Sequence, residues 1–337
     1  AAAGVPLIAL PLSEAADVAW LAALPAEALG RWHEPHFSLI VRGASGEKLE
    51  RTLSSLLALR LLGDRVPLHI RLATNAEPVA IAYVQREFVW AHGPRSVSRP
   101  MRGAGGEAMQ VAEAWYPADE HAISLVLSEG DRLSPHAYAW LKYAVLRYRY
   151  ADAQSLAAAT RGLLGIGLQP APPAFPRSAA SAGAPGTTHA ALLDAQIRSD
   201  ALCLMPESWV EFHESVSTEI ARLAPAAAPQ TSDAPSWQTV LSAMTGKSVP
   251  PAPDEEPQWP QLLDKLAVGS RWTAPSSLLR PHFVDADGVP LSFIETARSP
   301  GYAMRLATTS PFGRDERVLP SVKDLTRVAS SSKSRAA

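Results

Sequence analysis

The sequence predicts an α/β fold in which a mostly parallel sheet is flanked by helices. Two stretches carry this prediction. In the first, a strand at Phe37 to Val41, a helix from about Glu47 to Leu62 and a strand at Val66 to Leu72 follow one another with βαβ spacing. In the second, the apolar run Ala122 to Leu127 reads as a buried strand and leads into another helix. Repeated strand–helix units of this kind favour parallel strands.

Composition excludes several classes of protein. The chain has 337 residues and a formal net charge of -2, so no charge imbalance argues for a nucleic-acid partner. Cys203 is the single cysteine, which excludes an intrachain disulfide and a cysteine-rich metal site. Its apolar neighbours make it a core residue. No stretch reads as a membrane span, because acidic residues and prolines interrupt the apolar N-terminal stretch.

The chain divides into one large domain with two extensions. Residues 1–34 form an apolar N-terminal extension that needs cover from the domain or from a partner. Residues 35–304 form the domain, and residues 305–337 lose apolar periodicity and form a C-terminal tail. Three Pro/Ala-rich insertions interrupt the domain, at residues 169–188, 225–235 and 249–260.

An acidic turn follows the central buried strand. Glu129 and Asp131 come directly after that strand and are two residues apart, so an extended backbone directs both carboxylates to one side. Open α/β sheets bind ligands at the carboxyl ends of their strands. Two such carboxylates can hold Mg²⁺ or Mn²⁺, which bridges the phosphates of a nucleotide. An acidic turn between a strand and a helix is also commonplace as plain structure.

A second candidate lies earlier in the chain. Arg95, Arg99 and Arg102 occur in a stretch that also contains three glycines. One interpretation is a solvated loop. The other is a loop that faces a diphosphate, because guanidinium groups and free backbone N–H groups suit that ligand.

The middle of the chain resembles eukaryotic glycosyltransferase family two-like proteins. The resemblance spans about Phe37 to Phe293, and the segments that carry it are His92–Pro94, Glu113–Pro117, Leu133–Pro135, Trp140–Tyr143, Gly165–Leu168 and Pro206–His213. It implies a GT-A-like, Rossmann-related domain that binds a nucleotide-sugar. It also makes Glu207 and Glu211 the candidates for a general base.

The chain departs from this family at the metal-binding motif. The relatives carry glutamate and two aspartates at the end of the central strand, followed by a hydrophobic residue. Here Ser128 replaces the glutamate, Glu129 replaces the first aspartate and Gly130 replaces the second, while Asp131 takes the hydrophobic position. One carboxylate therefore keeps its place and the other is displaced by one residue. A metal site tolerates little displacement of its ligands.

Three functions follow from this reading. The favoured one is a degenerate glycosyltransferase fold without a cofactor, kept as a structural or accessory subunit whose extensions bind other subunits. The second is an active transferase, in which Glu129 and Asp131 hold Mn²⁺ or Mg²⁺ with a nucleotide-sugar and Glu207 or Glu211 acts as the base. The third is a module that binds a nucleotide or glycan without turnover. A fold does not establish an activity, so all three remain open.

The start of the chain bears on its location. The sequence begins at Ala1 without a methionine, which fits either a processed precursor or a trimmed chain. Removal of an organellar presequence predicts a mitochondrial setting. The alternative is the lumen of the secretory pathway, where active relatives of this kind work.

Overall fold

The structure is a computed structural model, and it describes residues 7–99, 113–151, 163–170, 191–194, 202–223, 277–281, 283–296 and 303–308. The three predicted insertions fall almost entirely outside these ranges, as does the predicted tail beyond residue 308.

A single large sheet organises the described part of the chain. It has eight strands in the order β3-β2-β1-β4-β8-β6-β9-β7, and four of its seven pairings are parallel. The predicted fold class, a mostly parallel sheet flanked by helices, is confirmed. The strands are β1 (His36–Gly43), β2 (Leu68–Leu72), β3 (Arg95–Ser98), β4 (Ala122–Ser128), β6 (Leu163–Gly167), β7 (Ala191–Asp194), β8 (Leu202–Leu204) and β9 (Ser277–Pro281).

The first four strands are wound as in a Rossmann-related sheet. β1 pairs in parallel with β2 on one side and with β4 on the other, and β3 lies beyond β2. The chain therefore reverses its direction of winding between β1 and β4. This reversal is a topological switch point, and ligands of open α/β sheets bind in the crevice outside the carboxyl ends of the two strands there.

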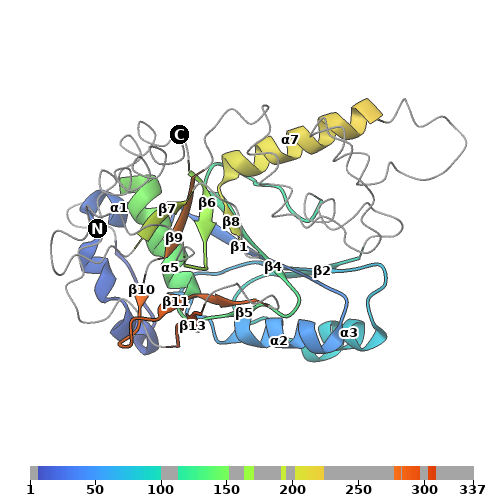
Figure 1. The fold of residues 1–337 in the computed structure, drawn as a ribbon, viewed down its shortest axis with the longest axis horizontal. Coiled ribbons are helices and arrows are strands. Elements are labelled where there is room, and N and C mark those ends of the chain that lie inside the picture. Colours follow the sequence, from blue (N-terminus) through green and yellow to red (C-terminus); the bar gives the residue numbers. More distant parts are fainter. Residues whose placement is uncertain are drawn as a thin grey trace, which may run out of the picture.

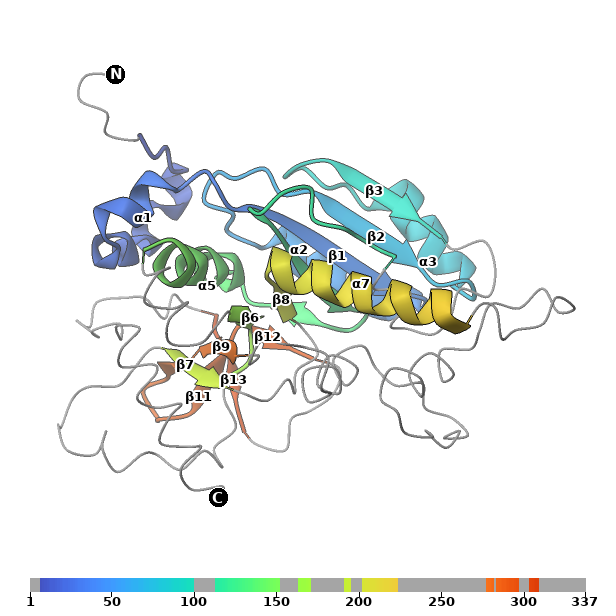
Figure 2. The ribbon, with the colours of Figure 1, turned by 90° about the horizontal axis from the view of Figure 1, so that it is seen from above.

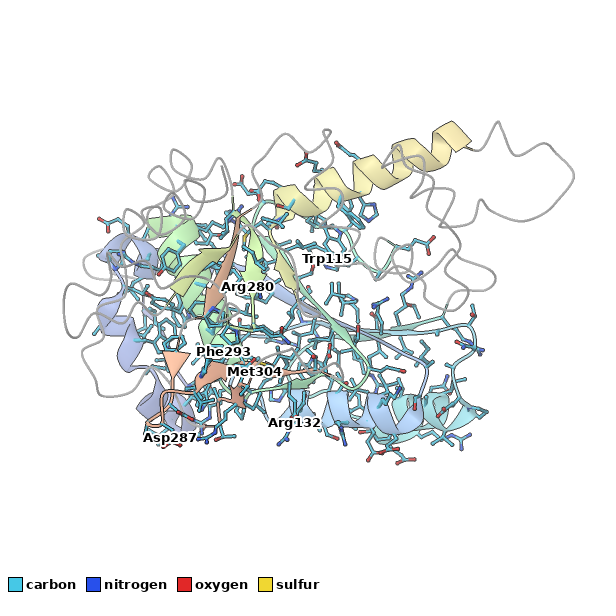
Figure 3. The ribbon with its side chains drawn as sticks, viewed as in Figure 1. Trp115, Arg132, Arg280, Asp287, Phe293 and Met304 are labelled. Carbon is cyan, nitrogen blue, oxygen red and sulfur yellow. The ribbon has the colours of Figure 1, made fainter. Side chains whose placement is uncertain are left out.

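Helices cover both faces of the sheet (Figures 1 and 2). On one face lie α2 (Gly46–Leu57) and α3 (Pro78–Ala82), which continues as the π-helical turn η3 (Tyr83–Glu87). On the other lies α7 (Pro206–Leu223). Strand β2 is fully covered on one face only, because its buried apolar residues alternate with the partly exposed His69 and Arg71. Trp115, labelled in Figure 3, packs its ring 5.5 Å from that of Trp209 on α7.

The helix predicted to run to Leu62 ends earlier. Helix α2 stops at Leu57, although Leu59, Leu61 and Leu62 are still buried. The chain turns instead through two left-handed residues, Leu62 with φ 57° and Gly63 with φ 84°. The apolar residues after Leu57 are buried in the core without being helical, and this is why the apolar pattern predicts too long a helix.

One strand was missed. The stretch from Arg95 is predicted as a loop on its charge, but Arg95–Ser98 form β3, the edge strand of the sheet. All four residues are exposed, so the strand lacks the alternation of apolar and polar residues that identifies a half-buried strand. Residues 100–112, which follow this segment, lie outside the described residues.

Helix α5 (Ala137–Ala144) and the π-helical turn η4 (Val145–Ala151) follow the central strand, and every residue of α5 is buried. Two small sheets complete the described part. Strand β5 (Arg132–Leu133) pairs with β12 (Ile294–Glu295), and β11 (Pro290–Ser292) pairs with β10 (Phe283–Val284) and β13 (Arg305–Leu306). Strand β13 brings the first residues of the predicted tail into the folded part.

The N-terminal extension lies on the chain's own domain. It consists of η1 (Leu12–Asp17), η2 (Ala19–Ala23) and α1 (Ala26–Gly30), and α1 lies beside α5 and η4 in Figure 2. Its inward side chains are buried in the main core: Trp20, Leu24, Ala28 and Trp32. Within the described residues, no helix combines the length and apolar character needed to cross a membrane.

Candidate functional site

The switch point between β1 and β4 is occupied by a side chain of the protein itself. Glu129, one residue past β4, places its carboxylate at the loop between β1 and α2. Its Oε2 atom accepts hydrogen bonds from the backbone N–H groups of Ala44 (2.5 Å) and Ser45 (2.8 Å). These two groups lead into the first turn of α2, where free N–H groups and the helix dipole attract an anion. Glu129 therefore occupies the position that suits a phosphate group.

A second carboxylate completes this cap. The N–H group of Gly46 donates to Oε2 of Glu77 at 2.8 Å, and the N–H group of Glu77 donates to the carbonyl of Ala44 at 2.8 Å. Sequence analysis missed Glu77, although Glu77 followed by Pro78 is a recognisable helix start. Two internal carboxylates thus neutralise the N-terminus of α2.

The turn after β4 is held tightly against α2. Gly130 has φ 90°, a left-handed conformation that favours glycine, and its N–H group donates to Oγ1 of Thr52 at 2.9 Å. Asp131 is buried, and its Oδ2 atom accepts the N–H group of Ser128 at 2.8 Å. A Cβ atom on Gly43 would lie 2.9 Å from Oε2 of Glu129, so a larger residue at this position would displace the Glu129 carboxylate.

The two predicted metal ligands are therefore both engaged with backbone donors. Oε2 of Glu129 accepts two N–H groups, and its Oε1 atom lies 4.0 Å from the ammonium of Lys48. Among the residues that the structure describes, no three acidic, histidine or cysteine side chains are grouped so that they could hold a metal ion. The placement of Glu129 and Asp131 fits helix capping and turn formation better than shared coordination of a divalent cation.

Of the three arginines predicted to face a diphosphate, the two that the structure describes bind backbone carbonyls instead. Arg95 is at the start of β3, where it donates to the carbonyls of Val84 (3.1 Å) and Phe88. Arg99 follows the end of β3 and donates to the carbonyl of Thr74. About 13 Å of extended backbone separates the two residues. Arg102 lies outside the described residues.

The predicted general bases lie near the amino-terminal end of β4, whereas Glu129 follows its carboxyl-terminal end. Strand β8 is antiparallel to β4, and Leu204 pairs with Ser124, so α7 begins near the start of β4. Glu207 in the first turn of α7 binds Arg149 through both carboxylate oxygens, at 2.6 and 3.0 Å. Glu211 lies one turn further along α7. Since β4 has seven residues, about 20 Å separates its two ends, and the structure does not bring Glu207 to Glu129.

Arg149 sets the ionisation of Glu207. Burial alone would raise the pKa of this carboxyl, but the hydrogen bonds and charge of Arg149 outweigh burial and lower the pKa below its ordinary value of 4.5. A base held in this way is a weaker proton acceptor than a free glutamate. The pair therefore acts as a link between α7 and η4.

A lowered pKa in the folded state predicts a defined pH dependence. The stabilisation that Glu207 contributes is present above pH 4.5 and is lost as the pH falls through its lowered folded-state pKa. We expect Glu207→Gln to lower the thermal unfolding midpoint at pH 7, and we expect its difference from the unmodified protein to shrink as the pH falls below 4.5. Glu214→Gln, an exposed change on the same helix, serves as the control. A difference between Glu207→Gln and the unmodified protein that persists unchanged to pH 3 would contradict the assignment.

Sequence analysis also missed two arginines near the site. Arg42 on β1 and Arg71 on β2 are direct partners in the parallel ladder, so they lie side by side on one face. Arg42 is buried and donates to Oγ of Ser128 at 3.3 Å, and Arg71 binds Glu113 at 2.6 Å. On β2 the alternation with buried apolar residues is a signal that could have identified Arg71. Strand β1 is buried almost throughout and offers no such signal for Arg42.

The fold and site together define a class of protein: an α/β domain with a Rossmann-related sheet whose switch point is filled by its own acidic turn. Residues 47–224 match the family model of the SPBC1E8.03c C-terminal domain. This match covers more than half of the 337 residues, and the chain belongs to that family. No curated protein matches the sequence.

Among solved structures, the chain is similar to two of S. aureus TarS, residues 1–349. The first shows 13% identity and a TM-score of 0.32 over 62% of this chain and 54% of that one. The second, in complex with UDP-GlcNAc, shows 13% identity and a TM-score of 0.26 over 40% of this chain and 34% of that one. Likeness at this level adds nothing to what the sheet order shows about the fold.

Proposed function

We propose that the chain is a glycosyltransferase-like protein without transferase activity, and that it serves as a structural or accessory subunit of a larger mitochondrial assembly. The observation that carries the proposal is the position of Glu129. Its Oε2 atom accepts the N–H groups of Ala44 and Ser45, so the carboxylate that the resembled glycosyltransferases would use for a metal caps α2 instead. A metal-dependent transferase of that kind needs this carboxylate free to face a metal-bound donor.

The surface of the domain supports the role of a subunit. Large apolar side chains are exposed on successive elements at the β3 side of the sheet: Val79 on α3, Val89 after η3 and Val97 on β3. Leu7 and Leu12 are exposed at the start of the N-terminal extension. Exposed apolar side chains of this kind suit contact with another protein. The inward side of the extension is buried on its own domain, so its outward side is the part left for a partner.

Titration calorimetry tests the absence of a donor site. We expect no metal-dependent heat when the purified protein is titrated with UDP and Mn²⁺, or with GDP and Mn²⁺. Micromolar, Mn²⁺-dependent binding that disappears in Glu129→Ala would overturn the proposal in favour of an active transferase.

Sedimentation of gently lysed cell fractions tests the assembly. We expect the protein in the mitochondrial fraction, at a mass well above that of one chain. Sedimentation as a single chain, or recovery from the lumen of the secretory pathway, would contradict the proposal.

The capping role of Glu129 makes a separate prediction about stability. We expect Glu129→Ala to lower the free energy of unfolding by about 1–2 kcal/mol, because the N–H groups of Ala44 and Ser45 lose their acceptor. Urea unfolding followed by circular dichroism measures this loss. Glu50→Ala, an exposed change on the same helix, should stay within about 0.5 kcal/mol of the unmodified protein. Equal effects of the two substitutions would show that Glu129 is not a cap.

A further inference from the structure

The N-terminal segment Leu7–Glu34, here called the strap, is fixed to the domain at two separate places. The first is an aromatic contact over α5. Trp20 stacks on Trp32 with ring centroids 5.9 Å apart, and it meets Tyr143 edge-on at 5.6 Å. Trp32 in turn lies 4.5 Å from the ammonium of Lys142. The strap therefore forms one wall around this lysine.

The second anchor is Glu14. Its Oε2 atom accepts the N–H group of Leu62 at 2.6 Å. Leu62 has φ 57°, a left-handed conformation that costs a branched, bulky residue about 1–2 kcal/mol. The charged acceptor on the strap offsets this cost. Without Glu14, the turn loses the contact that favours its strained form.

The Leu62–Asp64 turn and the aromatic contact both reach Lys142, which forms a buried ion pair with Asp64. Asp64, two residues after Leu62, accepts a hydrogen bond from Lys142 at 2.6 Å and another from the hydroxyl of Tyr138. The Lys142 side chain is 1% exposed and that of Asp64 is 19% exposed. An ammonium this deeply buried depends on its carboxylate. Burial lowers the pKa of Lys142, and Asp64 opposes that shift.

We infer that the strap is a latch, in which Glu14 holds the Leu62–Asp64 turn and the turn holds Asp64 on Lys142. Releasing the strap at Glu14 loosens the ion pair and exposes Lys142, although no contact joins Glu14 to Lys142 directly. Leu7 and Leu12, at the start of the described chain, are 86% and 93% exposed. The latch thereby couples this exposed segment to the buried Lys142 on α5.

Lysine acylation of the full chain tests the latch. Acetic anhydride at low concentration, followed by peptide mass spectrometry, reports the rate at each lysine. We expect Lys142 to be acylated about tenfold faster, or more, in Glu14→Ala than in the unmodified protein, because one charge-assisted hydrogen bond is lost from the closed state. Lys48, whose side chain is 61% exposed, is the internal reference and should not change. Glu27→Ala, an exposed change on the strap, is the matched control.

An unchanged rate at Lys142 in Glu14→Ala would overturn the inference. A second measurement changes the ion pair and follows the strap, because coupling between two sites is reciprocal. We expect Lys142→Met to speed hydrogen exchange at the amide of Leu62, which is bound to Glu14, and at the amide of Trp32, which is bound to Leu29. Unchanged exchange at both amides would show that the strap and the ion pair are independent.

Discussion

Replacing Asp64 with alanine is expected to lower the free energy of unfolding by about 3–5 kcal/mol at neutral pH. The substitution removes the only carboxylate that the structure places on the Lys142 ammonium among the described residues, and it takes the acceptor from the Tyr138 hydroxyl. A buried charge without its partner costs more than the intact pair contributes. Urea unfolding followed by circular dichroism measures the change.

Lys142→Met is the matched variant for this prediction. It removes the charge but keeps most of the side-chain volume, and it leaves Asp64 close enough to solvent to be hydrated, so its cost should be clearly smaller. The pH dependence gives a second check. A lysine pKa lowered below 10.5 in the folded state means that the native protein binds fewer protons, so stability rises as the pH approaches 10.5. The loss in Asp64→Ala should shrink over that range. A cost for Asp64→Ala no larger than that for Lys142→Met would contradict the account.

Trp140→Ala should also destabilise the protein by about 3–5 kcal/mol. The Trp140 ring is fully buried and stacks on Phe293 with centroids 5.8 Å apart and planes 1° apart, while Phe283 meets it edge-on at 5.8 Å. Its Nε1 atom donates to the carbonyl of Gly167 at 3.1 Å. Trp140 thus joins α5 to β6 and to the segment that contains Phe293, which is labelled in Figure 3.

Trp140→Phe separates the two contributions of this side chain. It retains an aromatic ring and loses the hydrogen bond to Gly167, so its cost should be well below that of the alanine variant. Thermal unfolding of both variants measures the difference. Equal losses would show that the hydrogen bond, rather than the packing of the ring, carries the stabilisation.

The first half of the fold could be predicted from the sequence because its elements have strong periodicity. Strands β1, β2 and β4 are apolar runs or clear alternations. The last strands of the described chain could not be predicted. Strands β10 to β13 have two or three residues each, too few for any pattern, and they are held by residues far away in the chain.

The position of the candidate site could be predicted, but its chemistry could not. Glu129 does lie at the end of a buried strand, as its sequence context indicates. Its hydrogen-bond donor Ala44 is 85 positions away in the chain, and nothing local to Glu129 reveals it. The placement of Glu207 depends on the direction of β8, and a strand of three residues does not disclose its direction.

Strand β8 has a consequence for biosynthesis. It lies between β4 and β6 and is antiparallel to both, so it is the seam that joins the first four strands to the rest of the sheet. The first four strands are synthesised long before Leu202–Leu204 emerge from the ribosome. During that interval β4 has an open edge of apolar residues, which is the kind of surface that pairs with other nascent chains. Substitutions that weaken β8 should therefore reduce the yield of soluble protein more than they reduce the stability of the protein once it has folded.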